Sequence, residues 1–231
     1  MTRHSAPPKV RHAQDRGPQR KVHVAGVEWQ SWVRRIRVPL GFLTAALYLI
    51  ECARCPLHPL AVVCSLALVL PGLALRAAAA GTVKKNRELT ISGPYAYTRN
   101  PLYLGSALIA GGFALALLDW PMALLIVLGF AAIYIPVIFS EERFLRGAFA
   151  GFDDYCRQVP RFFPRLTPAN VHETNHLRSP SHPVTSDARD GFSLALYFQH
   201  REYNAALGAA LLYLSLLYLR PLMDLIRQWM R

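Results

Sequence analysis

Long apolar stretches alternate along the chain with short segments that are polar or contain proline. The apolar stretches run through residues 38–50, 60–80, 101–118, 122–139 and 205–219. The second stretch is interrupted by Pro71-Gly72 and Arg76, and only Asp119-Trp120-Pro121 separates the third from the fourth. A helix that crosses the hydrocarbon core needs about 20 mainly apolar residues. The pattern therefore predicts an all-α, polytopic membrane protein with about four to five transmembrane helices.

The polar segments divide the chain into four parts. Residues 1–37 form a basic tail that ends in an aromatic and cationic collar, and we expect the tail to be disordered. Residues 38–166 form the membrane domain, residues 167–190 a polar linker, and residues 191–231 an apolar and amphipathic C-terminal segment. We expect the last apolar stretch to end at Arg220-Pro221; it either crosses the membrane or lies in its interface.

The composition supports this division. Hydrophobic residues make up 53% of the chain and charged residues only 17%, yet the net charge is +12. An ordinary soluble enzyme has more charged surface, and a disordered nucleic-acid-binding tail has fewer apolar residues. With the N-terminus in the cytoplasm, residues 1–37, 81–100 and 141–190 all lie on that side, as the positive-inside rule requires. We expect a bacterial inner-membrane protein whose partner is the lipid bilayer, not a nucleic acid.

Cysteine spacing gives little evidence for a metal centre. The CxxC pair Cys52 and Cys55 has no second pair elsewhere in the chain. A structural zinc site needs four ligands. No metal site is therefore expected.

Residues 92–103 concentrate the residue types that carry chemistry. Gly93-Pro94 predicts a turn, and Asn100-Pro101 predicts a helix start, with asparagine as the N-cap and proline at the first helical position. A capped membrane span with interfacial tyrosines would explain each of these pieces separately.

The spacing of the next two stretches brings further polar groups to the same place. From Pro101 to Leu118 is about 27 Å of helix, one bilayer core, and the following stretch returns the same distance. Arg99 and Tyr103 should therefore lie on the same membrane face as Glu141 and Glu142. Carboxylates at a membrane edge need pairing or hydration, and Arg99, Arg143 and Arg146 are candidate partners. Together these groups could bind a zwitterionic, aromatic-containing ligand while an apolar partner arrives from the lipid.

An ordered set of motifs carries a resemblance to a known family. The set consists of Gly93-Pro94-Tyr95, residues 99–105 (Arg-Asn-Pro-Leu-Tyr-Leu-Gly), Glu141-Glu142, and residues 159–164 (Val-Pro-Arg-Phe-Phe-Pro). From about residue 59 to 166 the chain resembles the isoprenylcysteine carboxyl methyltransferase and phospholipid methyltransferase superfamily. The resemblance implies an integral membrane enzyme that uses S-adenosylmethionine without a Rossmann domain. Gly105, Gly111 and Gly112 lie on a predicted helix and are expected to ease helix packing.

The resemblance also implies a set of cofactor-binding residues. They are Leu89, Thr90, Tyr95, Arg99, Asn100, Pro101, Leu102, Tyr103, Glu141 and Glu142. Glu141 would bind the ammonium group of the methionine moiety, and Arg99 would pair with the cofactor carboxylate or orient the glutamates. The two tyrosines would pack on the adenosine or near the sulfonium, which an aromatic face attracts. Arg99 and Glu141 are the predicted catalytic pair.

Two positions depart from the family pattern. Asn100 stands where the family has histidine, and an amide cannot accept a proton at neutral pH. Val137 stands where similar prenylcysteine enzymes have the arginine that meets the substrate carboxylate. These departures argue against a general base at position 100 and against a prenylcysteine carboxylate as substrate. The acceptor atom stays open among carboxylate, amine, hydroxyl and thiol.

The leading hypothesis is therefore a membrane methyltransferase that acts on a lipophilic acceptor. Two alternatives stay open: a non-catalytic membrane scaffold or lipid-binding protein of the same fold, and a membrane reductase. A reductase would need more cationic groups for nicotinamide phosphates than the loop residues Lys84, Lys85 and Arg87 supply.

Three further residues are assigned on weaker patterns. Arg76 either extends to the interface, as long cationic side chains do, or joins the site beside the glutamates. Phe162 and Phe163 are expected to cap the cofactor.

Overall fold

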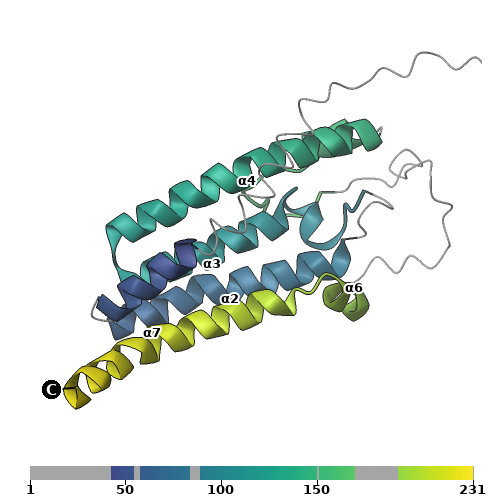
Figure 1. Ribbon diagram of the computed structural model, residues 1–231. Helices are drawn as coiled ribbons and strands as arrows, with labels where there is room; N and C mark the ends of the chain where they lie inside the picture. Colours follow the sequence, from purple (N-terminus) through teal and green to yellow (C-terminus); the bar gives the residue numbers. More distant parts are fainter. Residues whose placement is uncertain (1–42, 55–57, 84–88, 150, 170–191, 231) are drawn as a thin grey trace, which may run out of the picture.

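The computed structural model describes residues 43–54, 58–83, 89–149, 151–169 and 192–230 (Figure 1). Helices make up most of these ranges, and no strand occurs within them. The predicted all-α class is confirmed. The basic tail and collar, residues 84–88, and residues 170–190 of the predicted linker lie outside the described residues.

The helices follow the predicted apolar stretches. Residues 43–54 are helical, and then come α2 (Pro59–Thr82), η1 (Gly93–Ala96), α3 (Pro101–Leu117), α4 (Trp120–Ala148), α5 (Phe152–Gln158), α6 (Leu194–Gln199) and α7 (Tyr203–Trp229). By length and composition, α2, α4 and α7 can each cross a membrane, and α3 is a shorter apolar helix. These lengths support a polytopic membrane protein.

Three prolines lie inside continuous helices, and two of them, Pro71 and Pro221, interrupt or end apolar stretches in the sequence. Pro71 lies within α2, Pro136 within α4 and Pro221 within α7. Apolar helices tolerate an interior proline because neighbouring helices and local adjustment satisfy the freed carbonyl. The helix α7 therefore continues past Arg220-Pro221, where the last apolar stretch ends. The helix α4 likewise continues past the end of the fourth apolar stretch, through the glutamates to Ala148.

Glycines bring α2 and α3 into backbone contact. A Cβ atom on Gly72 would lie 2.8 Å from the carbonyl oxygen of Gly105, and one on Gly112 would lie 2.9 Å from that of Ser65. Small residues at such crossings let two membrane helices approach closely. The predicted packing role is confirmed for Gly105 and Gly112. It is wrong for Gly111, where an added Cβ would meet nothing within 4 Å.

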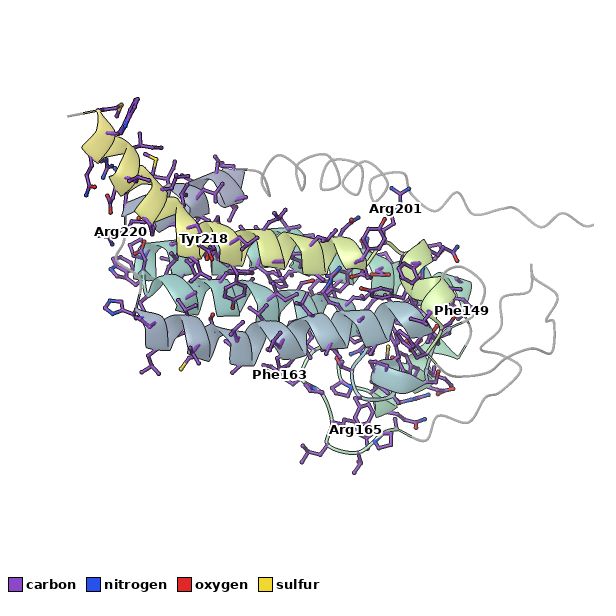
Figure 2. All side chains as sticks on the ribbon, turned by 90° about the horizontal axis from the view of Figure 1, so that it is seen from below. Phe149, Phe163, Arg165, Arg201, Tyr218 and Arg220 are labelled. Carbon is purple, nitrogen blue, oxygen red and sulfur yellow. The ribbon has the colours of Figure 1, made fainter. Side chains whose placement is uncertain are left out.

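Two buried clusters hold the elements together. The larger joins residues 43–54 to α2, α3 and α7 and includes Tyr48, Val69, Phe113 and Leu216. The smaller consists of Leu89, Phe149, Phe152, Tyr155 and Val159 and ties the segment before η1 to α5. Figure 2 shows Phe149 and Arg201 at one end of the bundle and Arg220 at the other. The smaller cluster therefore supports the polar groups at the Phe149 end.

Candidate functional site

The loop before α3 is fixed by the segment that follows α5, residues 159–169, which we call the arm. The backbone N–H of Arg99 donates to the carbonyl of Pro160 at 2.9 Å, and that of Arg165 donates to the carbonyl of Tyr97 at 3.0 Å. The loop donates the first of these bonds and the arm donates the second. The arm therefore holds the loop at the start of α3.

Asn100 contributes to the same attachment. It occupies the N-cap position of α3, with Pro101 as the first helical residue, as predicted. Its side chain makes no capping hydrogen bond, however, and its Nδ2 group donates to the carbonyl of Arg161 at 2.9 Å. The expected side-chain cap is therefore wrong, because the arm supplies an acceptor for the amide. Asn100 anchors the arm to the helix start.

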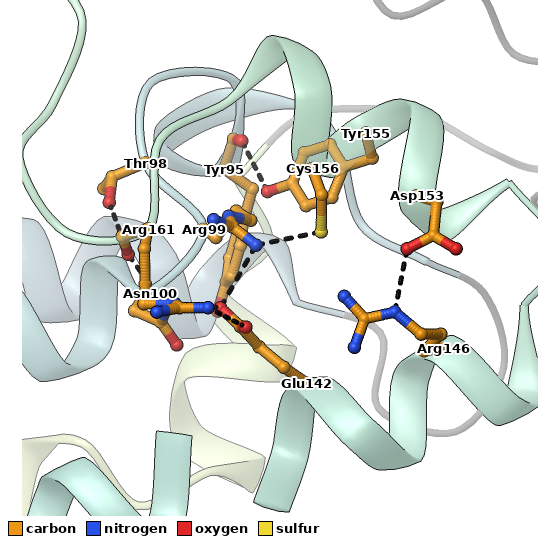
Figure 3. Close-up of polar contacts among 10 residues, drawn as sticks. All are labelled: Tyr95, Thr98, Arg99, Asn100, Glu142, Arg146, Asp153, Tyr155, Cys156 and Arg161. Atoms are coloured by element: carbon orange, nitrogen blue, oxygen red, sulfur yellow. Dashed lines mark hydrogen bonds and ion pairs between the residues drawn. The ribbon is translucent and has the colours of Figure 1, made fainter. Parts of the chain in front are cut away.

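Glu142 lies between two guanidinium groups (Figure 3). Its two carboxylate oxygens accept hydrogen bonds from Nε and Nη2 of Arg161 at 3.0 and 2.9 Å, and Nη1 of Arg99 lies 3.2 Å from Oε1. Only 5% of Glu142 is exposed. The hydrogen bond to this carboxylate raises the pKa of Arg161. Glu142 is thus a buried anion that two cations neutralise.

Another predicted partner of the glutamates bonds elsewhere. Arg146 pairs with Asp153 at 2.8 Å, and that pair is largely exposed. Arg161 takes the place expected for Arg146, because the arm folds back over α4. Arg161 lies inside the Val-Pro-Arg-Phe-Phe-Pro motif, yet its role was not predicted.

Glu141 has a separate partner. The hydroxyl of Tyr103 donates to Oε2 of Glu141 at 2.8 Å. The Tyr103 ring meets the Tyr134 ring edge to face at 5.4 Å, and Tyr134 stacks on Phe130 at 4.2 Å. The glutamate and the aromatic rings therefore form one wall, built from α3 and α4, as the helical hairpin predicts.

Arg99 occupies the centre of the polar cluster. Besides Glu142, its Nη1 group donates to Sγ of Cys156 at 2.9 Å. Burial raises the pKa of the Cys156 thiol, and the Arg99 charge opposes this shift. The Nε atom of Arg99 is buried and has no hydrogen-bond partner among the described residues. One donor of this guanidinium is therefore available to a ligand.

Two tyrosines complete the cluster on the side of α5. The hydroxyl of Tyr155 donates to the backbone carbonyl of Tyr95 at 2.8 Å. Burial raises the pKa of both phenols, and the nearby charges of Glu141 and Glu202 raise that of Tyr95 further. Both phenols are therefore neutral at physiological pH.

A cavity of about 390 Å³ opens at this cluster. All ten predicted cofactor-binding residues line it: Leu89, Thr90, Tyr95, Arg99, Asn100, Pro101, Leu102, Tyr103, Glu141 and Glu142. The remaining wall is formed by Arg76, Val83, Tyr134, Phe144, Leu145, Phe149, Phe152 and Tyr155. The volume and the mixture of apolar walls with a few polar groups are typical of small-molecule sites. The structure brings the ten residues together, and their roles as ligands stay predictions.

Arg76 lines the same cavity as Glu141 and Glu142, in agreement with the second expectation for this residue. Its ion-pair partner is another carboxylate, because its Nη2 group lies 2.8 Å from Oε2 of Glu202. The contact of Arg76 with Glu202 was not predicted, because nothing in the sequence relates these two positions, which are 126 residues apart.

Two other expectations concern the arm and the metal ligands. Phe162 and Phe163 do not line the cavity, and Phe163 is 81% exposed. Their positions therefore give no support to the expected role of capping the cofactor. Within the described ranges, no group of three or more histidine, cysteine, aspartate or glutamate side chains could hold a metal ion. Cys52 is buried in the larger cluster, and Cys55 lies outside the described residues.

Comparisons with known proteins match the same part of the chain. Over 84 residues it is 40% identical to the cobalt-zinc-cadmium resistance protein CzcN of Cupriavidus metallidurans and 39% identical to the nickel-cobalt-cadmium resistance protein NccN of Alcaligenes xylosoxydans xylosoxydans. Each alignment covers 36% of this chain and 39% of the relative's length. No solved structure matches at a significant level. Residues 62–151, which form most of the cavity wall, match the family described as phospholipid methyltransferase.

Proposed function

We propose that the chain is an integral membrane, S-adenosylmethionine-dependent methyltransferase that acts on a lipophilic acceptor. One observation carries the proposal: Arg99 and Glu141 line a single cavity within the segment that matches a methyltransferase family. The cavity lies on the cytoplasmic face of a bacterial inner membrane, because the positive-inside rule keeps the basic segments of the chain in the cytoplasm.

The groups around the cavity fit this cofactor. Glu141 accepts one hydrogen bond from Tyr103, and a carboxylate has about four lone-pair sites, so it can also bind an ammonium group. The Nε donor of Arg99, buried without a partner among the described residues, suits a carboxylate. Tyr103 and Tyr134 present rings that attract a cation such as a sulfonium. When bound, the cofactor supplies an electrophilic methyl group.

The chain's own residues position the reactants and exclude water. Glu142 holds the Arg99 guanidinium in place through the 3.2 Å ion pair. Leu89, Leu145 and Phe149 form an apolar wall that strengthens the electrostatic contacts inside the cavity. Asn100 cannot act as a base and serves instead to attach the arm. Catalysis therefore rests on positioning of an acceptor that arrives as a neutral or anionic nucleophile.

Direct cofactor binding tests the proposal. Calorimetric titration of the detergent-purified full chain with S-adenosylmethionine should give saturable binding that Glu141→Gln weakens. Asp154→Asn is the matched control, because Asp154 forms an exposed ion pair with Arg157 outside the cavity. Absence of binding at millimolar cofactor would overturn the proposal and favour a scaffold. Saturable binding of a nicotinamide dinucleotide in its place would favour a reductase.

Topology is tested separately. A reporter fused after Arg165, within the arm, should show the cytoplasmic signal. A periplasmic signal at that fusion would contradict the cytoplasmic placement of the cavity.

A further inference from the structure

The C-terminal segment attaches to the end of α2 beside the cavity. The backbone N–H of Ser193 donates to the carbonyl of Gly81 at 2.8 Å, and Nδ1 of His200 lies 2.9 Å from the carbonyl oxygen of Ala80. The Phe192 ring occupies the space beside Gly81, where an added Cβ would lie 2.3 Å from it. This segment lies beyond the residues that match the family. Its contacts with the end of α2 are therefore not accounted for by the family match.

The Arg76–Glu202 pair joins this segment to the cavity. Nε and Nη2 of Arg76 donate to both carboxylate oxygens of Glu202, at 2.8 to 3.0 Å. The Nη1 group of Arg76 also donates to the hydroxyl of Ser106 and to the carbonyl of Leu102 at 3.5 Å. Bidentate, charge-assisted bonds of this kind fix the orientation of the guanidinium. The side chain of Arg76 is thus held between α3 and the start of α7.

A second cavity, of about 240 Å³, has both members of this pair in its wall. Its walls come from α2, α6 and the start of α7 and consist of Leu73, Ala74, Arg76, Ala77, Tyr197, Glu202, Ala205 and Ala206. Among the described residues that line the two cavities, Arg76 alone is common to both. The Arg76 side chain, fixed by Glu202, therefore borders both cavities.

We propose that the smaller cavity receives the hydrocarbon chain of the methyl acceptor, a membrane amphiphile, and that the Arg76–Glu202 pair forms the polar end of this subsite. The inference rests on the proposed function. With cofactor in the larger cavity, the acceptor must approach from an adjoining space, and the smaller cavity adjoins it through one side chain. The Glu202 charge acts on the larger cavity too, since it raises the pKa of Tyr95.

Depth and chemistry support a hydrocarbon occupant. Arg76 lies six residues before the last residue of α2, about 9 Å along the helix axis, and the wall residues Leu73 and Ala74 lie further from that end. Both α2 and α7 are long and apolar enough to cross a membrane. Apart from the ion pair and Tyr197, the walls are aliphatic and mostly alanine, which leaves room for a hydrocarbon chain.

Photolabelling tests the assignment. The full chain is reconstituted in phosphatidylcholine vesicles that contain a phosphatidylethanolamine with a diazirine in its acyl chain, and labelled peptides are located by mass spectrometry. Wild-type protein should be labelled at the cavity walls in α2 and α7. Ala205→Phe, which fills the cavity, should lose this label. Ala210→Phe, at an exposed position of α7 that lines neither cavity, should keep it.

Binding of S-adenosylmethionine is measured on the same preparations. Retained cofactor binding with no label at the cavity walls, or with equal label in both variants, overturns the subsite and leaves the proposed function standing. Absence of cofactor binding by wild-type protein overturns the proposed function and the acceptor assignment with it. Ala77→Leu fills the cavity from the opposite wall, and its loss of label confirms that the effect of Ala205→Phe is not a folding defect of α7.

Discussion

Glu141 and Glu142 are adjacent and chemically identical, yet the same substitution should affect them differently. Glu142 is a buried anion between Arg99 and Arg161. Glu141 is exposed on its helix and accepts one hydrogen bond, from Tyr103. Glu142→Gln should therefore lower the stability of the fold, whereas Glu141→Gln should lower cofactor affinity and leave stability nearly unchanged.

The magnitude follows from the exposure of each ion pair. The side chains of Arg99 and Glu142 are 13% and 6% exposed, so the loss of this carboxylate leaves a buried guanidinium without a counter-charge. Removing one member of a buried pair costs about 3 to 5 kcal/mol. The Arg161 side chain is 45% exposed and adds roughly 1 kcal/mol or less. The glutamine keeps one acceptor, so we expect a total loss of about 3 to 4 kcal/mol. The single neutral-donor hydrogen bond of Glu141 accounts for about 1 kcal/mol.

Thermal unfolding in detergent, monitored by tryptophan fluorescence, measures the difference. A loss of about 3 to 4 kcal/mol lowers Tm by roughly 6 to 16 °C in a chain of this size. The Glu141 variant should unfold within a few degrees of wild type. Equal Tm values for the two variants, whether both are lowered or both are unchanged, would refute the assignment of Glu142 as the structural anion and Glu141 as the ligand.

Three further predictions use other contacts. Tyr103→Phe removes the hydrogen bond to Glu141, which contributes about 0.5 to 1.5 kcal/mol. The cofactor affinity measured by calorimetry should therefore fall by about 2- to 12-fold, and unchanged affinity would contradict this prediction. Gly105→Ala should lower stability by about 1 to 3 kcal/mol because its Cβ meets α2 backbone, whereas Gly111→Ala, in open space, should not. Burial raises the pKa of Cys156, so its alkylation at neutral pH should be slower than in unfolded chain; Arg99→Gln removes the opposing charge and should move the pH–rate profile to higher pH.

Helix positions could be predicted from the sequence because apolar periodicity and bilayer thickness act locally. The third stretch, 101–118, corresponds to α3 within one residue at its end. Helix ends could not be read from the ends of the apolar stretches, because α4 continues through the glutamates and α7 continues through Pro221. In a membrane the cost of an unsatisfied backbone group outweighs local propensity, so a helix continues past a residue that would end it in water.

Site residues could be predicted only as far as the hairpin reaches. Tyr103 and Glu141 were expected to meet because two helices of known length must return to the same face. Arg161 and Glu202 come from segments whose paths no periodicity specifies. Each is found only once the chain has folded back onto α3 or α2.

The different contacts of the two glutamates show why the arm, whose path could not be predicted, matters for the site. Successive residues on a helix point about 100° apart, so one carboxylate of the pair must face away from whatever the other contacts. The hairpin alone does not decide which of the two carboxylates meets Tyr103. The arm breaks this equivalence, since Arg161 approaches from one side, binds both oxygens of Glu142, and stacks over Phe139 at 4.7 Å. Glu141 is then left toward Tyr103 and the cavity. The binding carboxylate is therefore selected by a contact of its neighbour, and loss of Arg161 should weaken cofactor binding without any contact to the cofactor.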